Sequence, residues 1–153
     1  MQKFKFKLAG LLKLREFKEN KLKVEFGHIN REIEETKLLI KKLNNDLDEG
    51  YDAHEKILYK NAGGSLIRFF PEFFQAKRED IKNKENFIFA LQRKMELKRE
   101  ELAQARGEVK VIENLKDKKK QEYNKEMLKK EELMIEDLLM MRKNGDLKLN
   151  QEQ

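Results

Sequence analysis

The sequence predicts an all-α fold, a long two-helix antiparallel coiled-coil hairpin with a C-terminal helical overhang. Three observations support this prediction: a highly charged composition, two long apolar stripes with heptad spacing, and one cluster of turn-forming residues between them. Of the 153 residues, 42% are charged and 39% are apolar, whereas globular domains average about 25% charged and about 45–50% apolar residues. This composition favours a single elongated domain, residues 1–153, over a compact one.

The first helix is predicted to span about residues 8–60. From Leu22 onward its apolar residues recur with alternating spacings of four and three, which is the spacing of a coiled-coil seam. The stretch lacks Pro and carries strong helix formers outside the seam. The seam comprises Leu22, Phe26, Ile29, Ile33, Thr36, Ile40, Leu43 and Leu47.

A turn of about residues 61–70 is predicted to separate the helices. It begins with Asn61-Ala62-Gly63-Gly64-Ser65, the one cluster of turn-forming residues in the sequence. Pro71 suits the first turn of a helix but not its interior, because it lacks a backbone N–H. The second helix is therefore predicted to begin around Phe70 to Glu72.

The second helix is predicted to span about residues 71–143, with a seam that matches the first. An antiparallel register places the two polar seam residues, Thr36 and Lys98, in one layer, where Lys98 can extend its ammonium group outward. A parallel dimer of separate seams is the alternative. The predicted pairs are Leu47 with Ile88, Leu43 with Leu91, Ile40 with Met95, Thr36 with Lys98, Ile33 with Leu102, Ile29 with Ala105, Phe26 with Val109 and Leu22 with Ile112.

In this register residues 128–143 have no partner helix and form the predicted overhang. An isolated helix of this length is marginal in water, and flexible Met side chains adapt to several surfaces, so we interpret it as a docking segment that a partner orders. The alternative is a frayed end with an accidental apolar face, and residues 144–153 are expected to be a flexible tail. The apolar residues of the overhang include Leu133, Met134, Ile135, Leu138, Leu139, Met140 and Met141.

The net charge of +6 is concentrated near the N-terminus, where residues 3–23 contain eight Lys and Arg but only two Glu. Such a basic end favours contact with an acidic protein surface, an anionic lipid or nucleic acid. Acidic residues are spread through the remaining chain and no aromatic-basic platform is present, so nucleic acid is not expected as a partner. Charge alone does not choose between an acidic protein surface and an anionic lipid.

Several other classes of protein are not expected. No window approaches the roughly 18 consecutive apolar residues of a membrane span, and the N-terminus lacks the apolar core of a signal peptide. Without Cys the chain has no disulfide framework or thiolate zinc site, so a cytosolic protein is expected. His28 and His54 are interpreted as solvated, and Gly63-Gly64 is not followed by the Lys-Ser or Lys-Thr of a phosphate loop. We expect no metal, no cofactor and no enzymatic activity.

Four of the ten Phe residues lie within six positions after the turn, which is more apolar material than a two-helix seam requires. One interpretation is a hydrophobic plug that closes the hairpin, which suits Phe69 and Phe70. The other is an exposed patch that a partner covers, for which Tyr51 and Phe74 are the candidates.

The N-terminal motif Phe4-x-Phe6-x-Leu8-x-x-Leu11-Leu12-x-Leu14-Arg15-Glu16 resembles the signature of the flagellar export chaperone FliJ family. The Lys-rich segment Leu115 to Tyr123 and the stretch Ile135-Glu136-Asp137-Leu138, with Arg142 after it, agree with the family in outline.

The resemblance implies a stalk and chaperone protein of the flagellar type III export apparatus, a monomer or weak dimer at the cytoplasmic face of the inner membrane. The implied partners are the hexameric export ATPase, the cytoplasmic domain of the export gate protein, and export chaperones, through which the chain associates peripherally with the membrane. The implied ATPase-binding residues are Phe4, Phe6, Leu8, Leu11, Arg15, Leu138, Met141 and Arg142. The implied gate-binding residues are Tyr51, Phe74 and Ile81.

Two alternatives to the flagellar interpretation remain open. One is the equivalent stalk protein of a virulence type III secretion system, which shares the hairpin. The other is a structural coiled coil that self-associates through its Phe cluster and its Met-rich end.

Overall fold

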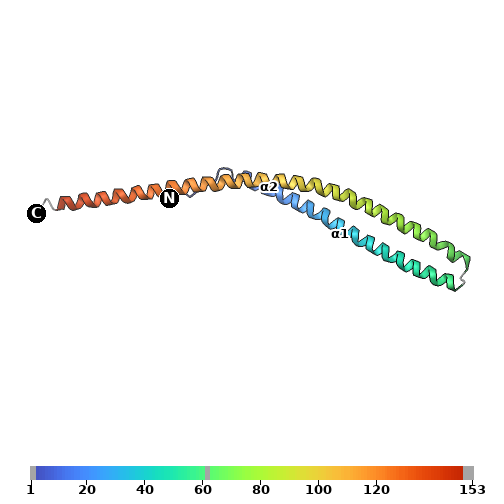
Figure 1. Cartoon of the computed structure of the whole chain (residues 1–153). Coiled ribbons are helices and arrows are strands. Elements are labelled where there is room, and N and C mark those ends of the chain that lie inside the picture. Colours follow the sequence, from blue (N-terminus) through green and yellow to red (C-terminus); the bar gives the residue numbers. More distant parts are fainter. Residues whose placement is uncertain (1–2, 61–62, 150–153) are drawn as a thin grey trace. The chain divides into compact units, whose positions relative to one another are not determined.

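The computed structural model describes residues 3–60 and 63–149. It contains two helices, α1 (Ala9–Tyr59) and α2 (Gly64–Leu149), which run side by side in the hairpin (Figure 1). No strand occurs among these residues, and the helices pack against each other in antiparallel directions, so the predicted all-α hairpin is confirmed. Within the same ranges, neither helix contains a stretch apolar enough to cross a membrane.

The helix ends follow from local hydrogen bonding. At the start of α1 the backbone N–H of Leu12 donates to the carbonyl of Leu8 at 2.9 Å. At its end the N–H of Lys60 donates to the carbonyl of Ile57 at 3.2 Å, a tight contact that satisfies one terminal carbonyl before the turn.

The second helix begins earlier than predicted, at Gly64, and Pro71 lies inside it. A proline in a helix interior costs about 3 kcal/mol or more, whereas full burial of one Phe side chain contributes about 1.5–3 kcal/mol. Phe70 and Phe74 are 7% and 8% exposed and pack against Leu47 of α1. Burial of these two rings in helical geometry thus offsets the cost of Pro71, which is why the predicted start was wrong.

The C-terminal end also differs from the prediction. Helix α2 continues to Leu149, so residues 144–149 are helical where a flexible tail was expected. The remainder of the predicted tail, residues 150–153, lies outside the described residues.

The chain divides into two compact units, which are described separately. The hairpin unit comprises residues 17–105, and the terminal unit comprises residues 1–16 together with residues 106–153. Both helices contribute residues to each unit.

Three clusters of buried residues form the core of the hairpin unit. Each cluster contains side chains of α1 and of α2, so apolar contacts between the helices hold this unit together. The clusters are Leu22 with Leu102 and Ala105, Ile29 and Ile33 with Leu91, and Leu47 with Phe70 and Phe74.

These contacts show that the predicted register was wrong. Ile33 packs near Leu91 rather than Leu102, which slides the helices by about three helical turns relative to the prediction. The reason is the turn: α2 begins at Gly64, so α1 must meet earlier residues of α2. Because an apolar stripe repeats with every helical turn, sliding it by whole turns leaves its pattern almost unchanged.

The predicted polar layer of Thr36 and Lys98 is absent for the same reason. The Thr36 hydroxyl is buried and donates instead to the backbone carbonyl of Glu32, at 2.7 Å. Lys98 forms ion pairs with Glu25 of α1 and Glu101 of α2, both at 3.0 Å.

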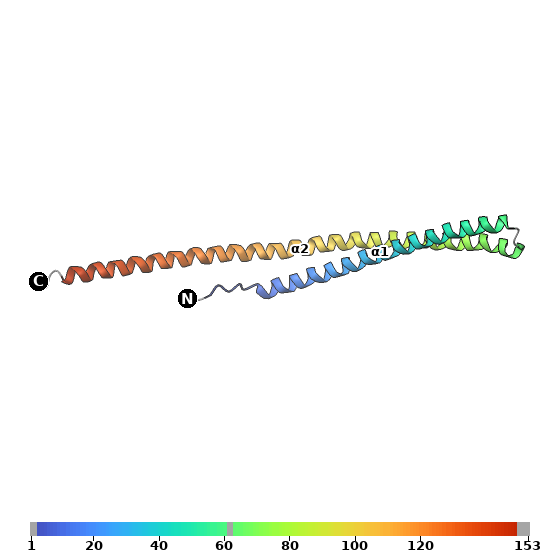
Figure 2. The same ribbon diagram turned by 90° about the horizontal axis from the view of Figure 1, so that it is seen from below.

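The terminal unit has a smaller core. Leu12 of α1 packs with Val109 and Ile112 of α2, and Phe6 covers this cluster from one side. Phe6 belongs to an extended segment that precedes α1 (Figure 2). Arg15 and Glu108 form an ion pair beside the cluster, which adds a charged contact between the helices.

Candidate functional site

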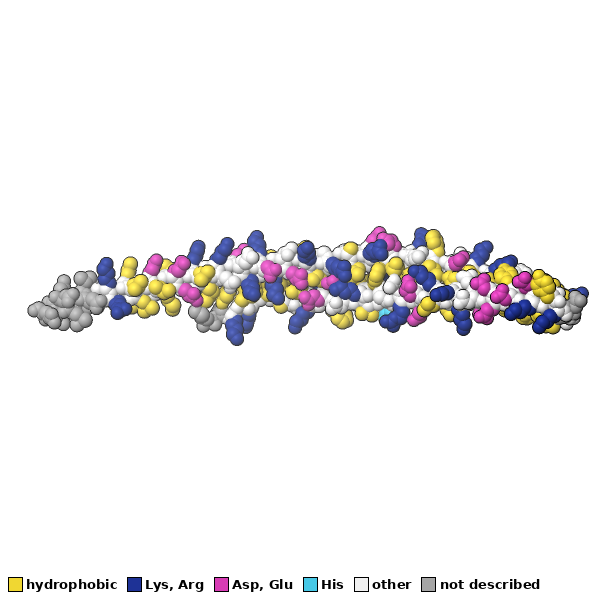
Figure 3. Space-filling model, turned by 60° about the horizontal axis from the view of Figure 1, so that its bottom comes forward, with side chains coloured by type: hydrophobic (Ala, Val, Ile, Leu, Met, Phe, Trp, Pro, Cys, Tyr) yellow, Lys and Arg dark blue, Asp and Glu magenta, His cyan; other side chains and the backbone are white. Residues whose placement is uncertain are grey.

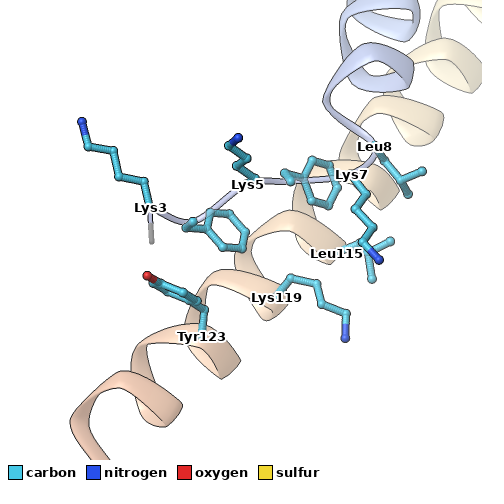
Figure 4. Close-up of a pocket in the computed structure, with 9 residues that line it drawn as sticks. Lys3, Lys5, Lys7, Leu8, Leu115, Lys119 and Tyr123 are labelled. Carbon is cyan, nitrogen blue, oxygen red and sulfur yellow. The ribbon is translucent and has the colours of Figure 1, made fainter. Parts of the chain in front are cut away.

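The extended segment of residues 3–7 presents two different faces. Lys3, Lys5 and Lys7 are exposed, whereas Phe4 and Phe6 are half-buried. This alternation is the geometry expected of extended backbone, in which successive side chains point to opposite sides. We call residues 3–8 the strap, because its Phe side chains lie against α2 (Figure 4).

Each Phe of the strap has a defined contact. The ring of Phe4 lies 5.6 Å from that of Tyr123, centroid to centroid, at an interplanar angle of 50°. Such tilted aromatic pairs contribute about 0.5–1.5 kcal/mol beyond the burial of their area. Phe6 packs on the core of the terminal unit. The strap is therefore held by two aromatic anchors.

The strap and α2 line a half-open cavity of about 1130 Å³. Its walls combine apolar and aromatic side chains with Lys side chains, as Figure 4 shows. We call it the strap cavity. Its lining residues are Lys3, Phe4, Lys5, Phe6, Lys7, Leu8, Leu115, Lys119 and Tyr123.

The electrostatics of the strap cavity are basic. Lys119 forms a 2.8 Å ion pair with Glu122, and this hydrogen bond raises the pKa of Lys119 and lowers the pKa of Glu122. Within the described residues Lys3, Lys5 and Lys7 form no ion pair. Their ammonium groups are available to an acidic ligand.

The structure brings together the predicted N-terminal ATPase-binding residues in the terminal unit. Leu8 lines the strap cavity at 38% exposure, and Leu11 is 39% exposed on α1. Arg15 is engaged with Glu108 inside the chain, a contact that the sequence pattern did not indicate. Of these residues, Leu8 lines the strap cavity together with Phe4 and Phe6.

The predicted overhang is helical and exposed. We define it as residues 128–144 of α2; its large apolar side chains are 57–72% exposed. Leu138 is 65% exposed, Met141 is 72% exposed, and Arg142 is also exposed. Figure 3 shows hydrophobic side chains at the surface beside the grey C-terminal residues, interleaved with charged ones. This surface lacks the burial that a core helix would have.

The three predicted gate-binding residues lie together in the hairpin unit. The ring of Tyr51 stacks on Phe74, with centroids 4.3 Å apart and planes inclined by 28°. Ile81 is half-buried against the cluster that contains Phe74. Tyr51 is 40% exposed, but Phe74 is 8% exposed and belongs to the core. The buried Phe74 ring therefore holds the Tyr51 ring in place, and Phe74 itself does not form part of an exposed surface.

The Phe cluster, which comprises Phe69, Phe70, Phe73 and Phe74, fits each of the two predicted interpretations in part. Phe70 is buried as a plug would be, whereas Phe69 is 56% exposed. Phe69 stacks on Phe73, with ring centroids 5.7 Å apart. The plug interpretation therefore fits Phe70 but not Phe69.

Three features near Tyr51 were missed by the sequence analysis. Arg78 donates a hydrogen bond to the Tyr51 hydroxyl and lies 5.9 Å from its ring centroid. His54 was expected to be solvated, but it is half-buried, with its ring 4.9 Å from that of Phe70. These side chains can be placed only when the helix register is known, and the register predicted from the sequence was wrong.

Gly50 marks the third missed feature, a close approach of α1 to the Phe rings of α2. A Cβ at this position would lie 2.8 Å from Cε1 of Phe73 and 3.0 Å from Cε1 of Phe74. Its position inside the predicted first helix was the signal available in the sequence, since Gly inside a helix often has a packing reason.

No group of three or more His, Asp or Glu side chains within the described ranges could hold a metal ion. His28 is exposed, as predicted.

A family model described as the flagellar FliJ protein matches residues 4–146 of the sequence. No curated protein and no solved structure matches the chain.

Proposed function

The chain belongs to the FliJ family of flagellar proteins, and from this membership we propose that it is the stalk that couples the export ATPase to the export gate. Membership itself implies a non-catalytic stalk or chaperone role in flagellar type III export. The proposal adds three partners: the hexameric ATPase, whose assembly and activity the chain promotes; the cytoplasmic domain of the gate protein; and export chaperones.

The observation that carries the proposal is the exposed overhang of α2. Its apolar side chains, among them Leu138 and Met141, are more than half exposed on a helix without a covering partner in the terminal unit. Burial of such side chains contributes about 1.5–3 kcal/mol each when it is complete. A ring-shaped partner with an apolar channel would gain this energy by enclosing the helix.

The positive charge of the strap also supports the assignment of ATPase binding to the terminal unit. Lys3, Lys5 and Lys7 present positive charge beside the aromatic anchors Phe4 and Phe6. Complementary charges on a partner increase the association rate more than they increase the affinity. The overhang would supply most of the binding energy, and the strap would steer the encounter.

The gate contact is assigned to Tyr51 and its surroundings. Tyr51 is fixed by stacking on Phe74 and by the hydrogen bond from Arg78, so little conformational freedom is lost when a partner covers it. Exposed aromatic residues that are already ordered are frequent contributors to binding energy. Ile81 supports this site by packing on the same cluster.

We place the protein at the cytoplasmic face of the inner membrane, held there peripherally by its partners. The family match favours the flagellar apparatus over the equivalent virulence secretion system.

The proposal is tested by a paired substitution on the overhang, Leu138→Asp with Met141→Asp. Stimulation of the export ATPase by this variant should fall at least tenfold, because two charges would enter an apolar contact. The matched control is Leu97→Asp, an exposed Leu of α2 in the hairpin unit. Equal stimulation by both variants would reject the overhang as the ATPase-binding segment.

A further inference from the structure

The strap cavity has the character of a binding site for an acidic segment with apolar side chains. Its floor is made by Phe4, Phe6, Leu115 and Tyr123, and Lys side chains surround it. A concave apolar surface with a few charged groups is typical of specific binding sites. The charged groups here are all positive, so the occupant should be negative.

The overhang of the same chain has this composition. Residues 131–141 contain four acidic and seven apolar residues and no basic one. The apolar side chains of this stretch are 57–72% exposed. We call it the acidic segment; its carboxylates belong to Glu131, Glu132, Glu136 and Asp137.

The cavity and part of the acidic segment face the same way on α2. Met134, Leu138 and Met141 follow Tyr123 at intervals close to whole numbers of helical turns, so all four side chains lie on one face. Lys119 of the cavity and Asp137 of the segment lie on this side of α2 as well, separated by five helical turns or about 27 Å along the helix. One long helical partner can therefore contact both.

We propose that the strap cavity binds the acidic segment of a second copy of this chain, in an antiparallel pair of α2 helices. Placing Lys119 opposite Asp137 of the second copy brings Asp137 of the first copy opposite the other Lys119. Both cavities are then filled by the same contact, as a two-fold axis requires. In this register Tyr123 of each copy falls opposite Leu133 of the other.

The charges along this pairing are complementary. Lys119 falls opposite Asp137 of the second copy, and Glu126 falls opposite Lys130. Lys3, Lys5 and Lys7 on the strap add positive charge beside the bound segment. A parallel pair in register would instead place each acidic segment against its copy, where like charges repel.

In the proposed function the ATPase binds the overhang, which the dimer would bury. The dimer would therefore prevent ATPase binding until the ATPase hexamer displaces the second copy. The existence of the dimer does not depend on the proposed function, because it is measured on the purified chain alone.

The first test is sedimentation velocity of the full-length chain over a range of concentrations. The wild type should show a monomer–dimer equilibrium that Lys5→Glu with Lys119→Glu, or Glu136→Lys with Asp137→Lys, weakens at least tenfold. An equimolar mixture of these two variants should recover dimer, since each supplies the charge that the other requires. The control, Lys41→Glu with Lys42→Glu, alters exposed lysines of α1 in the hairpin unit and should dimerise like the wild type.

Two outcomes would overturn the proposal. One is a wild type that stays monomeric at every concentration, even if its strap-cavity variant loses binding to another acidic protein. The other is a mixture of the two charge variants that stays monomeric while circular dichroism shows both to be helical.

Crosslinking tests the direction of the pairing. The chain contains no Cys, so Lys119→Cys and Asp137→Cys introduce single thiols. With a short bismaleimide, the antiparallel pair predicts a crosslinked dimer mainly when the two variants are mixed. Strong crosslinking of each variant with itself would indicate a parallel pair and contradict the proposal.

Discussion

Phe4 lies against Tyr123 of α2, so a residue that precedes the first helix is anchored far along the second one. This contact, with that of Phe6, holds the strap, which lines the strap cavity. The arrangement places exposed lysines, anchored aromatic rings and the start of the overhang in one compact unit. The proposed dimer derives from this arrangement, whereas the proposed ATPase contact rests mainly on the exposed overhang.

Removal of Phe6 should release the strap. Phe6→Ala is expected to cost about 1–2 kcal/mol, less than the roughly 3–5 kcal/mol of a fully buried Phe, because the ring is half-buried. The nuclear Overhauser effect between the Phe4 and Tyr123 rings, which lie 5.6 Å apart, should weaken in this variant, whereas Lys5→Ala, on the exposed face, should leave it unchanged. An unchanged effect in Phe6→Ala would mean that the Phe6 ring does not anchor the strap.

Gly50 and Gly27 should respond oppositely to substitution by Ala. Gly27 has nothing within 4 Å of its Cβ position, so Gly27→Ala should stabilise α1 by about 0.5–1 kcal/mol. At Gly50 the new methyl group meets the Phe73 and Phe74 rings, and overpacking of this kind costs about 1–3 kcal/mol. Urea unfolding of the two variants measures the difference, and stabilisation by both would refute the close approach.

The Glu25–Lys98 ion pair should give a pH-dependent contribution to stability. The hydrogen bond from Lys98 lowers the pKa of Glu25 below its usual 4.5, so the contribution is full above that pH and is lost as the pH falls through the lowered pKa. Hydrogen bonds to Glu101 and Glu25 raise the pKa of Lys98 above its usual 10.5, so the contribution persists at neutral pH and is lost only as the pH rises through the raised pKa.

Thermal unfolding of Glu25→Gln tests this pH dependence. Its Tm should fall below that of the wild type at pH 7 and should match the wild type in the acidic range, where Glu25 is protonated. A Tm difference that stays constant across this range would argue against the ion pair.

Tyr51 should be required for gate binding through its ring rather than its hydroxyl. Tyr51→Phe keeps the stacking on Phe74 and loses only the hydrogen bond from Arg78. In a pull-down with the cytoplasmic domain of the gate, Tyr51→Ala should lose most binding and Tyr51→Phe should retain it. ATPase binding by both variants should equal that of the wild type, and loss of it would indicate a general folding defect.

The sequence was sufficient for the features that depend on local pattern. Heptad spacing predicted both helices, Gly63-Gly64 located the turn, and the apolar residues after residue 127 predicted an exposed overhang. The register could not be predicted in the same way, because an apolar stripe fits its partner at many offsets separated by whole turns.

The helix register also determines which of the predicted site residues are exposed. The burial of Phe74 and the placement of Arg78 beside Tyr51 follow from a turn that ends at Gly63 and a helix that continues through Pro71. The local preference of Pro71 pointed to a later start, and the packing of Phe70 on Leu47 outweighed it. A prediction based on local preference alone could not include that packing energy.

Stimulation of the purified export ATPase by a chain truncated after residue 127 tests the central claim most directly. This chain retains the strap, its contacts with Tyr123 and the hairpin unit, and it lacks the overhang. Circular dichroism should show that it remains helical, while stimulation of ATP hydrolysis should be lost. Stimulation equal to that of the full chain would contradict the assignment of the overhang as the ATPase-binding segment.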